Sequence, residues 1–552
     1  MPQFSLDATP RRKRLRGPAV LTPALYTRNV SSEVDLLPAL QRYWGYESFR
    51  PLQERIVRSL LGGHDACVVM PTGGGKSLCY QLPAALSSKT AVVISPLIAL
   101  MQDQVAQLSQ MGIAAALLNS SISAREQTSV MRDAACGKYR LLYLSPERLA
   151  RADTAAWLRT LPLSFFAIDE AHCISEWGHE FRPEYRQLSR LRKQFPECPI
   201  AAFTASATQR VRHDIIAQLE LRDSHNYIAS FNRPNLRYLV KMSDARTQPE
   251  MLLRALRKYP EGNIIVYSPT IARVDATVAL LEERGIAAIP YHGKMEPEER
   301  RRNQERWMSN EVRVLVGTLA FGLGINKESV RAVIHLALPK SLEQFYQEAG
   351  RAGRDGLPAD CILLWQKRDA GLLAHFIGQI EDGAERNRAW DRYHEIRKFV
   401  EEKVCRHRQI CAHFGEKTKW ERCDACDVCG CDVEWLSEAH ETARPAKSKA
   451  AKPGKAGKGA ARADDFAEID SDLREFLREW RRTTAKRQMV PAYVVMHDSS
   501  LDDLCRKLPG SLAEVRQVSG FGERKTELYG PQILEAFAEF RKAGRAAHHA
   551  GK

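Results

Sequence analysis

Three glycines, a lysine and a serine stand side by side in the segment Met70–Ser77, which reads Met-Pro-Thr-Gly-Gly-Gly-Lys-Ser. The apolar run Ala66–Met70 before it predicts a buried strand, and Leu78–Leu86 after it predicts a helix. Three glycines let backbone N–H groups surround a phosphate, while Lys76 reaches the β- and γ-phosphates and the Ser77 hydroxyl holds Mg²⁺. The first glycine of the usual pattern is a methionine here, so a plain glycine turn is the alternative interpretation.

Two carboxylates follow another buried run. Phe165–Ile168 is apolar and is followed by Asp169-Glu170-Ala171-His172. A carboxylate at the end of a buried strand can hold Mg²⁺, and a second one beside it can activate the attacking water. Ligands of parallel sheets bind beyond the carboxyl ends of the strands, which is also where the glycine-rich loop lies. A loop or a helix cap is the alternative, and the glycine-rich loop upstream favours a hydrolytic site.

Short apolar runs alternate with helical patterns in two successive stretches of the chain. The candidate strands of the first stretch are Ala66–Met70, Ala91–Ser95, Leu141–Ser145, Phe165–Asp169 and Ile200–Thr204. Those of the second are Ile264–Tyr267, Ala287–Tyr291, Val312–Val316 and Ala332–Leu336. Such alternation predicts two mostly parallel sheets, each covered by helices on both faces.

The second stretch has no Gly-Lys-Ser of its own, but two arginines stand near its end. Arg351 and Arg354 are three residues apart, so they share one face if the segment is helical. Arginines can cross an interdomain cleft and stabilise the charge of a phosphoryl group in transfer. A salt-bridged surface turn is the alternative.

The balance of charge points to a polyanionic partner. The 552 residues include 82 Lys and Arg against 67 Asp and Glu, a formal net charge of +15, and 44% are hydrophobic. This length allows roughly three or four domains, and the basic excess suits nucleic acid. Part of the excess lies in the segments 11–16 and 444–462, so a basic tail is the alternative. The longest apolar run is too short for a membrane helix, which needs about 18 residues.

Five of the thirteen cysteines crowd between positions 411 and 431. Cys423, Cys426 and Cys429 are spaced so that three sulfurs can surround one ion, and a fourth from a helix would complete a tetrahedron. The candidates for that fourth position are Cys405, Cys411, Cys431, His407 and His413. This distribution suits a reduced, cytosolic protein with a metal site better than a disulfide framework. Cysteines packed in a core are the alternative.

These segments together resemble the RecQ family of superfamily-two helicases from about residue 36 to 436. The motifs that carry the resemblance are WGYESFRPLQ (44–53), MPTGGGKSLCYQ (70–81), SPLIALMQDQV (95–105), DEAHCISEWGHEFRPEY (169–185), FTASAT (203–208), VLVGTLAFGLGINK (314–327) and QEAGRAGRDG (347–356). Ser206 stands where a threonine is commoner in the family.

The resemblance implies a role for each motif. The residues that it assigns to ATP are Tyr46, Arg50, Gln53, Thr72, Gly73, Gly74, Gly75, Lys76 and Ser77. Those that it assigns to hydrolysis are Lys76, Asp169 and Glu170, with Arg351 and Arg354 facing the γ-phosphate and with Ser77 and Asp169 on Mg²⁺. The implied ligands of a structural Zn²⁺ are Cys405, Cys423, Cys426 and Cys429. The adenine would be read by Gln53, although Trp44–Gln53 can also be an amphipathic helix entry.

The single-stranded DNA contacts implied by the family are Trp177, His179, Phe181 and Arg182. Bases stack on aromatic faces, at roughly 1–3 kcal/mol each, and an arginine adds cation–π attraction. An aromatic core loop is the alternative, but the charged residues between the aromatic ones disfavour it.

The implied fold class is α/β, with two tandem RecA-like parallel-sheet domains, then a helical zinc-binding module and a small all-α HRDC-like bundle. The expected bounds are 1–31 for a disordered basic arm, 32–231 and 232–365 for the two RecA-like domains, 366–436 for the zinc module, 437–465 for a flexible basic linker and 466–545 for the HRDC-like bundle. The winged-helix domain that the family usually places after the zinc module is missing, because the linker lacks apolar residues. In the bundle, the turn Val518–Gly522 before Lys525 can offer N–H groups to a DNA phosphate; protein docking is the alternative.

The expected function is that of an ATP- and Mg²⁺-dependent DNA helicase that moves 3′→5′ in DNA repair or recombination. A DNA-stimulated translocase or remodeller with little strand separation is the alternative, and an adaptor with a dead ATPase is disfavoured because every expected catalytic residue is present. The expected partners are single-stranded and tailed duplex DNA and a single-stranded-DNA-binding protein, with no membrane and a monomer favoured. The expected location is the bacterial cytoplasm, at the nucleoid, or the nucleus of a eukaryote.

Overall fold

The structure is a computed structural model that describes residues 35–178, 180–318, 327–436, 470–488 and 490–550. The predicted arm 1–31, the predicted linker 437–465 and His179 lie outside the described residues. Among the described helices, none is both long and apolar enough to cross a lipid bilayer.

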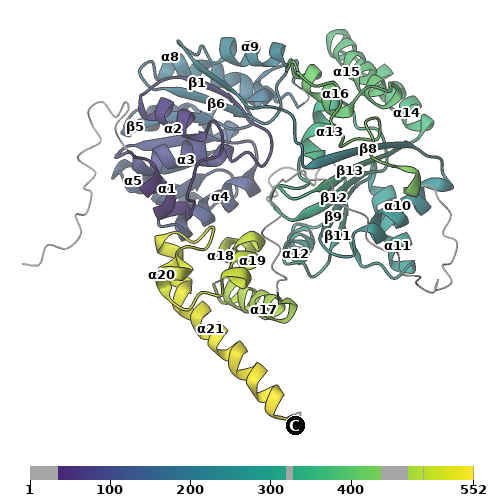
Figure 1. Ribbon diagram of the computed structural model, residues 1–552. Coiled ribbons are helices and arrows are strands. Elements are labelled where there is room, and N and C mark those ends of the chain that lie inside the picture. The colour runs from purple at the N-terminus through teal and green to yellow at the C-terminus, as the bar shows by residue number, and fades with distance from the viewer. Residues whose placement is uncertain (1–34, 179, 319–326, 437–469, 489, 551–552) are drawn as a thin grey trace, which may run out of the picture.

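Domain 1 is a seven-stranded parallel sheet with helices on both faces (Figure 1). In spatial order its strands are β3 (Ala115–Leu118), β4 (Leu141–Leu144), β2 (Thr90–Ile94), β5 (Leu163–Ile168), β6 (Ile200–Thr204), β1 (Ala66–Val69) and β7 (His225–Ile228). One face carries α1 (Leu37–Trp44), α2 (Gln53–Leu61), α3 (Lys76–Leu86) and α4 (Ile98–Gln110). The other carries α5 (Ala124–Ala135), α6 (Pro146–Leu149), α7 (Ala152–Leu158), α8 (Leu191–Gln194), α9 (Gln209–Gln218), η2 (Ala171–Ile174) and η3 (Pro183–Arg190).

The alternation of side chains along each strand explains the two cores of this domain. On β1, Ala66 and Val68 face one cluster of buried residues, while Cys67 and Val69 face the other. All four are buried, which is why the strand reads as one continuous apolar run.

Domain 2 is a six-stranded parallel sheet. In spatial order its strands are β10 (Ala288–Tyr291), β11 (Val314–Gly317), β9 (Asn263–Tyr267), β12 (Val330–His335), β13 (Ala359–Trp365) and β8 (Leu236–Met242). Its helices are α10 (Thr247–Lys258) and α11 (Ile271–Glu283) on one face and α12 (Pro297–Met308) and α13 (Leu342–Ala349) on the other. The fold class predicted from the sequence is confirmed, although β3, β7, β8 and β13 were not among the predicted strands.

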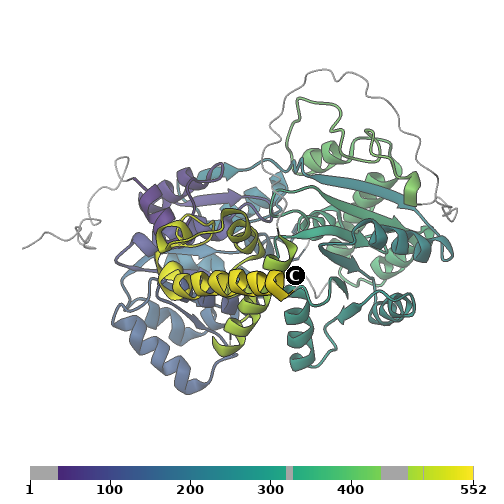
Figure 2. The same ribbon diagram turned by 60° about the horizontal axis from the view of Figure 1, so that its bottom comes forward.

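Two smaller parts complete the chain. The cysteine module, residues 366–436, contains α14 (Lys367–Gly378), α15 (Gly383–Glu401), α16 (Arg406–His413) and η4 (Glu434–Leu436). The C-terminal bundle, residues 470–550, contains α17 (Ser471–Gln488), α18 (Ala492–Val495), α19 (Asp498–Lys507), α20 (Leu512–Val515) and α21 (Glu523–Ala550) around its own core. Figures 1 and 2 show the bundle, in yellow, against both domains, where it contacts α1, α4 and α12.

Candidate active site

The glycine-rich segment Met70–Ser77, called here the phosphate loop, connects β1 to α3. Gly73 and Gly75 have φ angles of 82° and 83°, in the left-handed region that favours glycine. The loop leads into the N-terminus of α3, where backbone N–H groups and the helix dipole favour an anion. Lys76 Nζ donates to the carbonyl oxygen of Met70 at 3.3 Å, so its ammonium is held at the mouth of the loop.

The two carboxylates lie at the end of β5, at the same edge of the sheet. Asp169 is buried, and Glu170 has a left-handed φ of 47°, a strained backbone of the kind that clusters at functional sites. Burial and the charge of Glu170 raise the pKa of Asp169 to about 7, against the opposing charge of Lys76. Such a site favours a bound cation, because a positive ion would remove the cost of burying two adjacent negative charges.

A hydrogen-bonded path connects Glu170 to the neighbouring strand. His172 Nδ1 lies 3.3 Å from a carboxylate oxygen of Glu170 and 3.0 Å from Thr204 Oγ1 at the end of β6. Across the domain boundary, Gln347 Nε2 donates to Ser206 Oγ at 2.7 Å. The segment FTASAT therefore connects to Glu170 through His172 and contacts domain 2 directly.

The predicted adenine reader lies against the phosphate loop. Gln53 is buried, and its side-chain amide donates to the carbonyl oxygens of Gly74 and Gly75 at 3.3 Å each. The guanidinium of Arg50 donates to the carbonyl oxygen of Gly73. Tyr46 lines the same cavity. The structure brings Tyr46, Arg50 and Gln53 together beside the phosphate loop. The side-chain amide of Gln53 is hydrogen-bonded to backbone carbonyls of that loop.

Arg351 and Arg354 are not on a helix, because α13 ends at Ala349 and both arginines follow it in a turn. Their meeting at one place therefore comes from this turn, residues 350–356, called here the arginine turn, and not from helical periodicity. A Cβ built on Gly73 would lie 3.1 Å from Cγ of Arg354, so the turn contacts the phosphate loop. Burial lowers the pKa of Arg354 to about 9, and the charges of Arg351 and Arg233 add to the shift.

A cavity of about 780 Å³ joins these groups. This volume is within the range of small-molecule sites, roughly 300–1,000 Å³. The lining residues used above are Tyr46, Gln53, Lys76, Asp169 and Glu170 from domain 1 and Arg351 and Arg354 from domain 2. The cavity therefore combines a phosphate loop, two carboxylates and two guanidinium groups, which is the set of charges needed to bind and hydrolyse a nucleoside triphosphate.

Sequence reasoning missed a third contributor to this cavity, the C-terminal bundle. His497, Ser499 and Lys525 line it together with Glu328 of domain 2. Lys525 is 4% exposed, and burial lowers its pKa to about 8. Contacts between domains have no periodic signature in the sequence, so His497 and Ser499 were not marked beforehand, and Lys525 was noted only beside a turn predicted to contact DNA.

Ionic and hydrogen-bonded contacts hold the bundle to both domains. Asp498 accepts from Arg481 within the bundle at 2.8 Å and from Lys327 of domain 2 at 3.2 Å. On the other side, the hydroxyls of Tyr493 and Tyr529 donate to Asp103 and Gln110 on α4.

The turn Val518–Gly522, predicted to offer N–H groups to a DNA phosphate, packs against the end of α1 at Phe521 and Gly522, while Ser519 and Gly520 line the cavity. A Cβ on Gly45 would lie 2.6 Å from the backbone of Phe521, and one on Gly522 would lie 2.5 Å from the carbonyl oxygen of Arg42. The close backbone approach covers the turn at Phe521 and Gly522, and the contact with a DNA phosphate stays a prediction.

The described residues of the predicted DNA-contacting segment lie at the surface of domain 1, after η2. Trp177 is 37% exposed, with the guanidinium carbons of Arg210 and Arg388 at 3.0 and 5.4 Å from its ring centre. The guanidinium of Arg186 lies 5.3 Å from the ring centre of Phe181, and Arg182 pairs with Glu180 at 2.8 Å. Aromatic faces and guanidinium groups together suit a single strand of nucleic acid.

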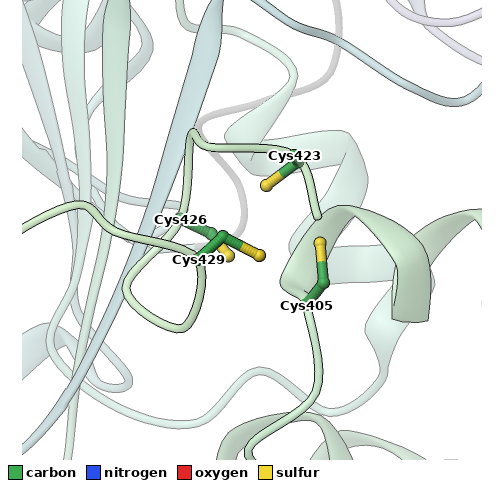
Figure 3. A group of neighbouring side chains, drawn as sticks. All are labelled: Cys405, Cys423, Cys426 and Cys429. Carbon is green, nitrogen blue, oxygen red and sulfur yellow. The ribbon is translucent and has the colours of Figure 1, made fainter. Parts of the chain in front are cut away.

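Four cysteine sulfurs converge in the cysteine module, and Figure 3 shows that of Cys405 directed toward those of Cys423, Cys426 and Cys429. All four sulfurs lie within 4.8 Å of one another. Four thiolates at this separation fit a tetrahedral structural Zn²⁺, with Zn–S distances of about 2.3 Å. Arg406 pairs with Asp427 at 2.8 Å beside them and ties α16 to the cysteine loop.

The spare candidates for the fourth ligand lie elsewhere. His413 is bonded to Glu343 of α13 and Glu395 of α15, and Cys411 and Cys431 are not members of the four-sulfur group.

Known families match the chain in the order of its structural parts. The DEAD/DEAH box helicase family matches residues 50–215 and the helicase conserved C-terminal domain matches 247–356. The RecQ zinc-binding domain matches 367–430 and the HRDC domain matches 470–537. These ranges coincide with domain 1, domain 2, the cysteine module and the C-terminal bundle.

Two curated proteins and one solved structure place the chain further. It is 41% identical over 394 residues to the ATP-dependent DNA helicase RecQ of Haemophilus influenzae, covering 71% of this chain and 63% of the relative. It is 38% identical over 415 residues to the protein of the same name from Bacillus subtilis, covering 74% and 68%. The DEAD-box helicase Mss116 bound to single-stranded RNA shares the fold, with a TM-score of 0.53 and 15% identity over 72% of this chain and 92% of that one.

The chain thus spans a little under two thirds of the length of the Haemophilus relative and a little over two thirds of the Bacillus relative. With the four domain matches in family order and this level of identity, the chain belongs to the RecQ family of helicases.

Proposed function

We propose that the protein is an ATP-dependent DNA helicase that moves 3′→5′ along single-stranded DNA and separates the duplex ahead of it. The observation that carries the proposal is the cavity between the two sheets, where Lys76 and Asp169 face Arg351 and Arg354. The RecQ relatives carry the name ATP-dependent DNA helicase, which supports the same activity.

In the proposed reaction, water attacks the γ-phosphorus of ATP, and the bond to the β-γ bridging oxygen breaks to leave ADP and phosphate. Glu170 accepts a proton from the attacking water, while Lys76, Arg351 and Arg354 stabilise the charge on the phosphoryl oxygens. Mg²⁺, held by Ser77 and Asp169, would neutralise the phosphates further. The phosphate loop and the adenine-side residues Tyr46, Arg50 and Gln53 bind the nucleotide.

Single-stranded and tailed duplex DNA are the proposed substrates. Trp177, Phe181 and Arg182, with His179 between them in sequence, contact the single strand, and the net charge of +15 supports a polyanionic partner. The four cysteines bind one structural Zn²⁺. We place the protein in the bacterial cytoplasm, a location that the two bacterial relatives support. Its action there as a monomer, at the nucleoid, in DNA repair or recombination and with a single-stranded-DNA-binding protein is part of the proposal.

A second candidate function is a DNA-stimulated translocase with little strand separation. It is favoured by the short interval between the zinc-binding match, which ends at residue 430, and the HRDC match, which begins at 470. The family places its winged-helix domain in this interval, and 39 residues are too few for a typical domain of 50 residues or more.

One experiment separates the two functions. ATP hydrolysis and strand separation are measured on a duplex with a 3′ tail and on one with a 5′ tail, with Lys76→Ala as the inactive control. The helicase proposal expects DNA-stimulated hydrolysis with unwinding of the 3′-tailed duplex only. Hydrolysis with displacement of streptavidin from a biotinylated single strand, but no unwinding, would establish the translocase instead.

A further inference from the structure

The segment that joins the two domains contains an arginine that contacts both walls of the cavity. Arg233 lies between β7 and β8, and its guanidinium group donates three hydrogen bonds to backbone carbonyls. Nη1 donates to the oxygen of Thr72 in the phosphate loop at 3.1 Å. Nη2 donates to the oxygens of Ala352 and Gly353 in the arginine turn, at 3.2 and 3.0 Å. One rigid side chain thus connects the two halves of the candidate active site.

A second residue of the joining segment, Asn235, also bonds to the arginine turn. Asn235 Nδ2 donates to the carbonyl oxygens of Gly353 and Leu357 at 2.8 and 3.0 Å. Gly353 has a left-handed φ of 54°, and a Cβ on it would lie 2.6 Å from Asn235 Nδ2. Pro234, between the two residues, fixes its own φ and restricts the backbone of Arg233. The joining segment therefore fixes the position of the arginine turn through hydrogen bonds and a restricted backbone.

We propose that Arg233 is a positioning residue for ATP hydrolysis, which sets how far the arginine turn stands from the phosphate loop. Arg233 is not one of the described residues that line the cavity, so it acts through the phosphate loop and the arginine turn, to which it is hydrogen-bonded. The inference rests on the proposed role of Arg354 in hydrolysis. Nothing in the motif pattern of the sequence assigns a role to this arginine.

The chemistry of the guanidinium group explains why an arginine is needed at this point. Its planar fork presents donors in fixed directions, so one side chain can fix three carbonyls from two domains in one geometry. A lysine at this position would keep the positive charge, but its ammonium would not present N–H donors in these fixed directions. A displacement of about 1 Å at a group that acts on the transition state can cost about 100-fold in rate.

Charge adds a second effect to this geometry. Burial is the main cause of the lowered pKa of Arg354, and the positive charges of Arg351 and Arg233 lower this pKa further. The charge of Glu328 opposes the repulsion that Arg351 and Arg233 exert on Arg354, but its effect is the smaller one. The phosphates of ATP would relieve this repulsion, so closure of the two walls around the nucleotide becomes more favourable.

The test is a double-mutant cycle on hydrolysis stimulated by single-stranded DNA. The full-length chain is compared with Arg233→Gln, Arg354→Gln and the double variant, and Arg257→Gln on α10 removes one exposed positive charge as the matched control. We expect Arg233→Gln to lower kcat about 10- to 100-fold with KM for ATP within about threefold. Arg233→Lys should restore only part of kcat. Because Arg233 acts partly through Arg354, the loss of kcat in the double variant should be smaller than the product of the two single losses.

Two results would overturn the inference: a kcat of Arg233→Gln equal to that of Arg257→Gln, or independent losses that multiply in the double variant. If Arg354→Gln keeps the wild-type kcat, it is the proposed role of Arg354 that fails. Thermal unfolding followed by circular dichroism checks that each variant folds. Where Arg233→Gln lacks a cooperative transition, Arg233→Lys and Asn235→Ala replace it in the cycle, with the same two results deciding.

Discussion

The two walls of the active-site cavity are built on similar parallel sheets, yet they carry their functional groups in different ways. In domain 1, Lys76 and Asp169 follow strands β1 and β5, so a single sheet fixes the distance between them. In domain 2, Arg351 and Arg354 follow a helix and are seated on the segment that joins the domains. The groups of the first wall are therefore fixed within one domain. The distance of the arginines from that wall depends on the position of domain 2 relative to domain 1.

The first wall predicts the largest effect. Lys76→Ala should lower kcat for ATP hydrolysis by about 10⁴-fold, because it removes the ammonium proposed to stabilise the charge on the phosphoryl oxygens in the transition state. It should also weaken ATP binding, because the same ammonium binds the phosphates in the ground state. A phosphate-release assay with single-stranded DNA measures it, and Lys89→Ala, which removes an exposed lysine next to the same helix, is the control. Equal activity of the two variants would remove the phosphate loop from the mechanism.

The second wall predicts a smaller loss with a different signature. Arg354→Gln should lower kcat about 10²- to 10³-fold. Nucleotide binding should persist, because the phosphate loop of the first wall is unchanged in this variant. Binding of a fluorescent ATP analogue, measured by anisotropy beside kcat, distinguishes the two variants: it should be weakened in Lys76→Ala and nearly kept in Arg354→Gln. Loss of binding in both would mean that the walls do not differ in this way.

The metal site bears on the second wall, because the cysteine loop pairs with the edge of its sheet. Tyr238 on β8 forms a parallel bridge with Cys426. Cys426→Ser should release the Zn²⁺ and lower the melting temperature by about 5 °C or more, since structural zinc contributes directly to folding. Native mass spectrometry should find one Zn²⁺ in the wild type and in Cys136→Ser, an exposed cysteine, and none in Cys426→Ser. Zinc retained in Cys426→Ser would refute the ligand assignment.

The docked C-terminal bundle predicts the smallest change, because it lines the cavity but carries none of the groups proposed to act on the phosphates. Burial alone would raise the pKa of Asp498, but the charges of Lys327 and Arg481 hold it well below its usual range. Asp498→Ala leaves two buried cations without their shared anion, so the bundle should separate from domain 2. We expect a larger radius of gyration by X-ray scattering and a rise of about two- to fivefold in KM for ATP, as a wall of the cavity is lost.

The control for this variant is Asp472→Ala, at an exposed position of α17 in the same bundle. An unchanged radius of gyration in Asp498→Ala would show that other contacts, such as the hydrogen bond from Tyr493 to Asp103, suffice for docking.

Much of the first wall could be predicted because its chemistry is contiguous in the sequence. The phosphate loop and the acidic pair each follow a short apolar strand, and the parallel-sheet rule then places both at one edge. The strand β8 was not predicted, since Arg237 and Lys241 interrupt the apolar run of Leu236–Met242. The edge strand β7 is short and largely exposed, so its apolar signal is weak. The edge strand β3 is apolar but only four residues long, with two alanines that suit a helix as well as a strand.

The sequence by itself determined the residue types of the site, the two-sheet architecture and the three clustered cysteines, because these depend on local spacing and on the period of buried side chains. Only the tertiary structure decided which cysteine completes the metal site, that Arg351 and Arg354 stand on a turn, that Lys525 lines the cavity, and that Arg233 bonds to the phosphate loop and to the arginine turn. These contacts join segments up to several hundred residues apart. They follow from how whole domains pack, and packing leaves no periodic trace in the chain.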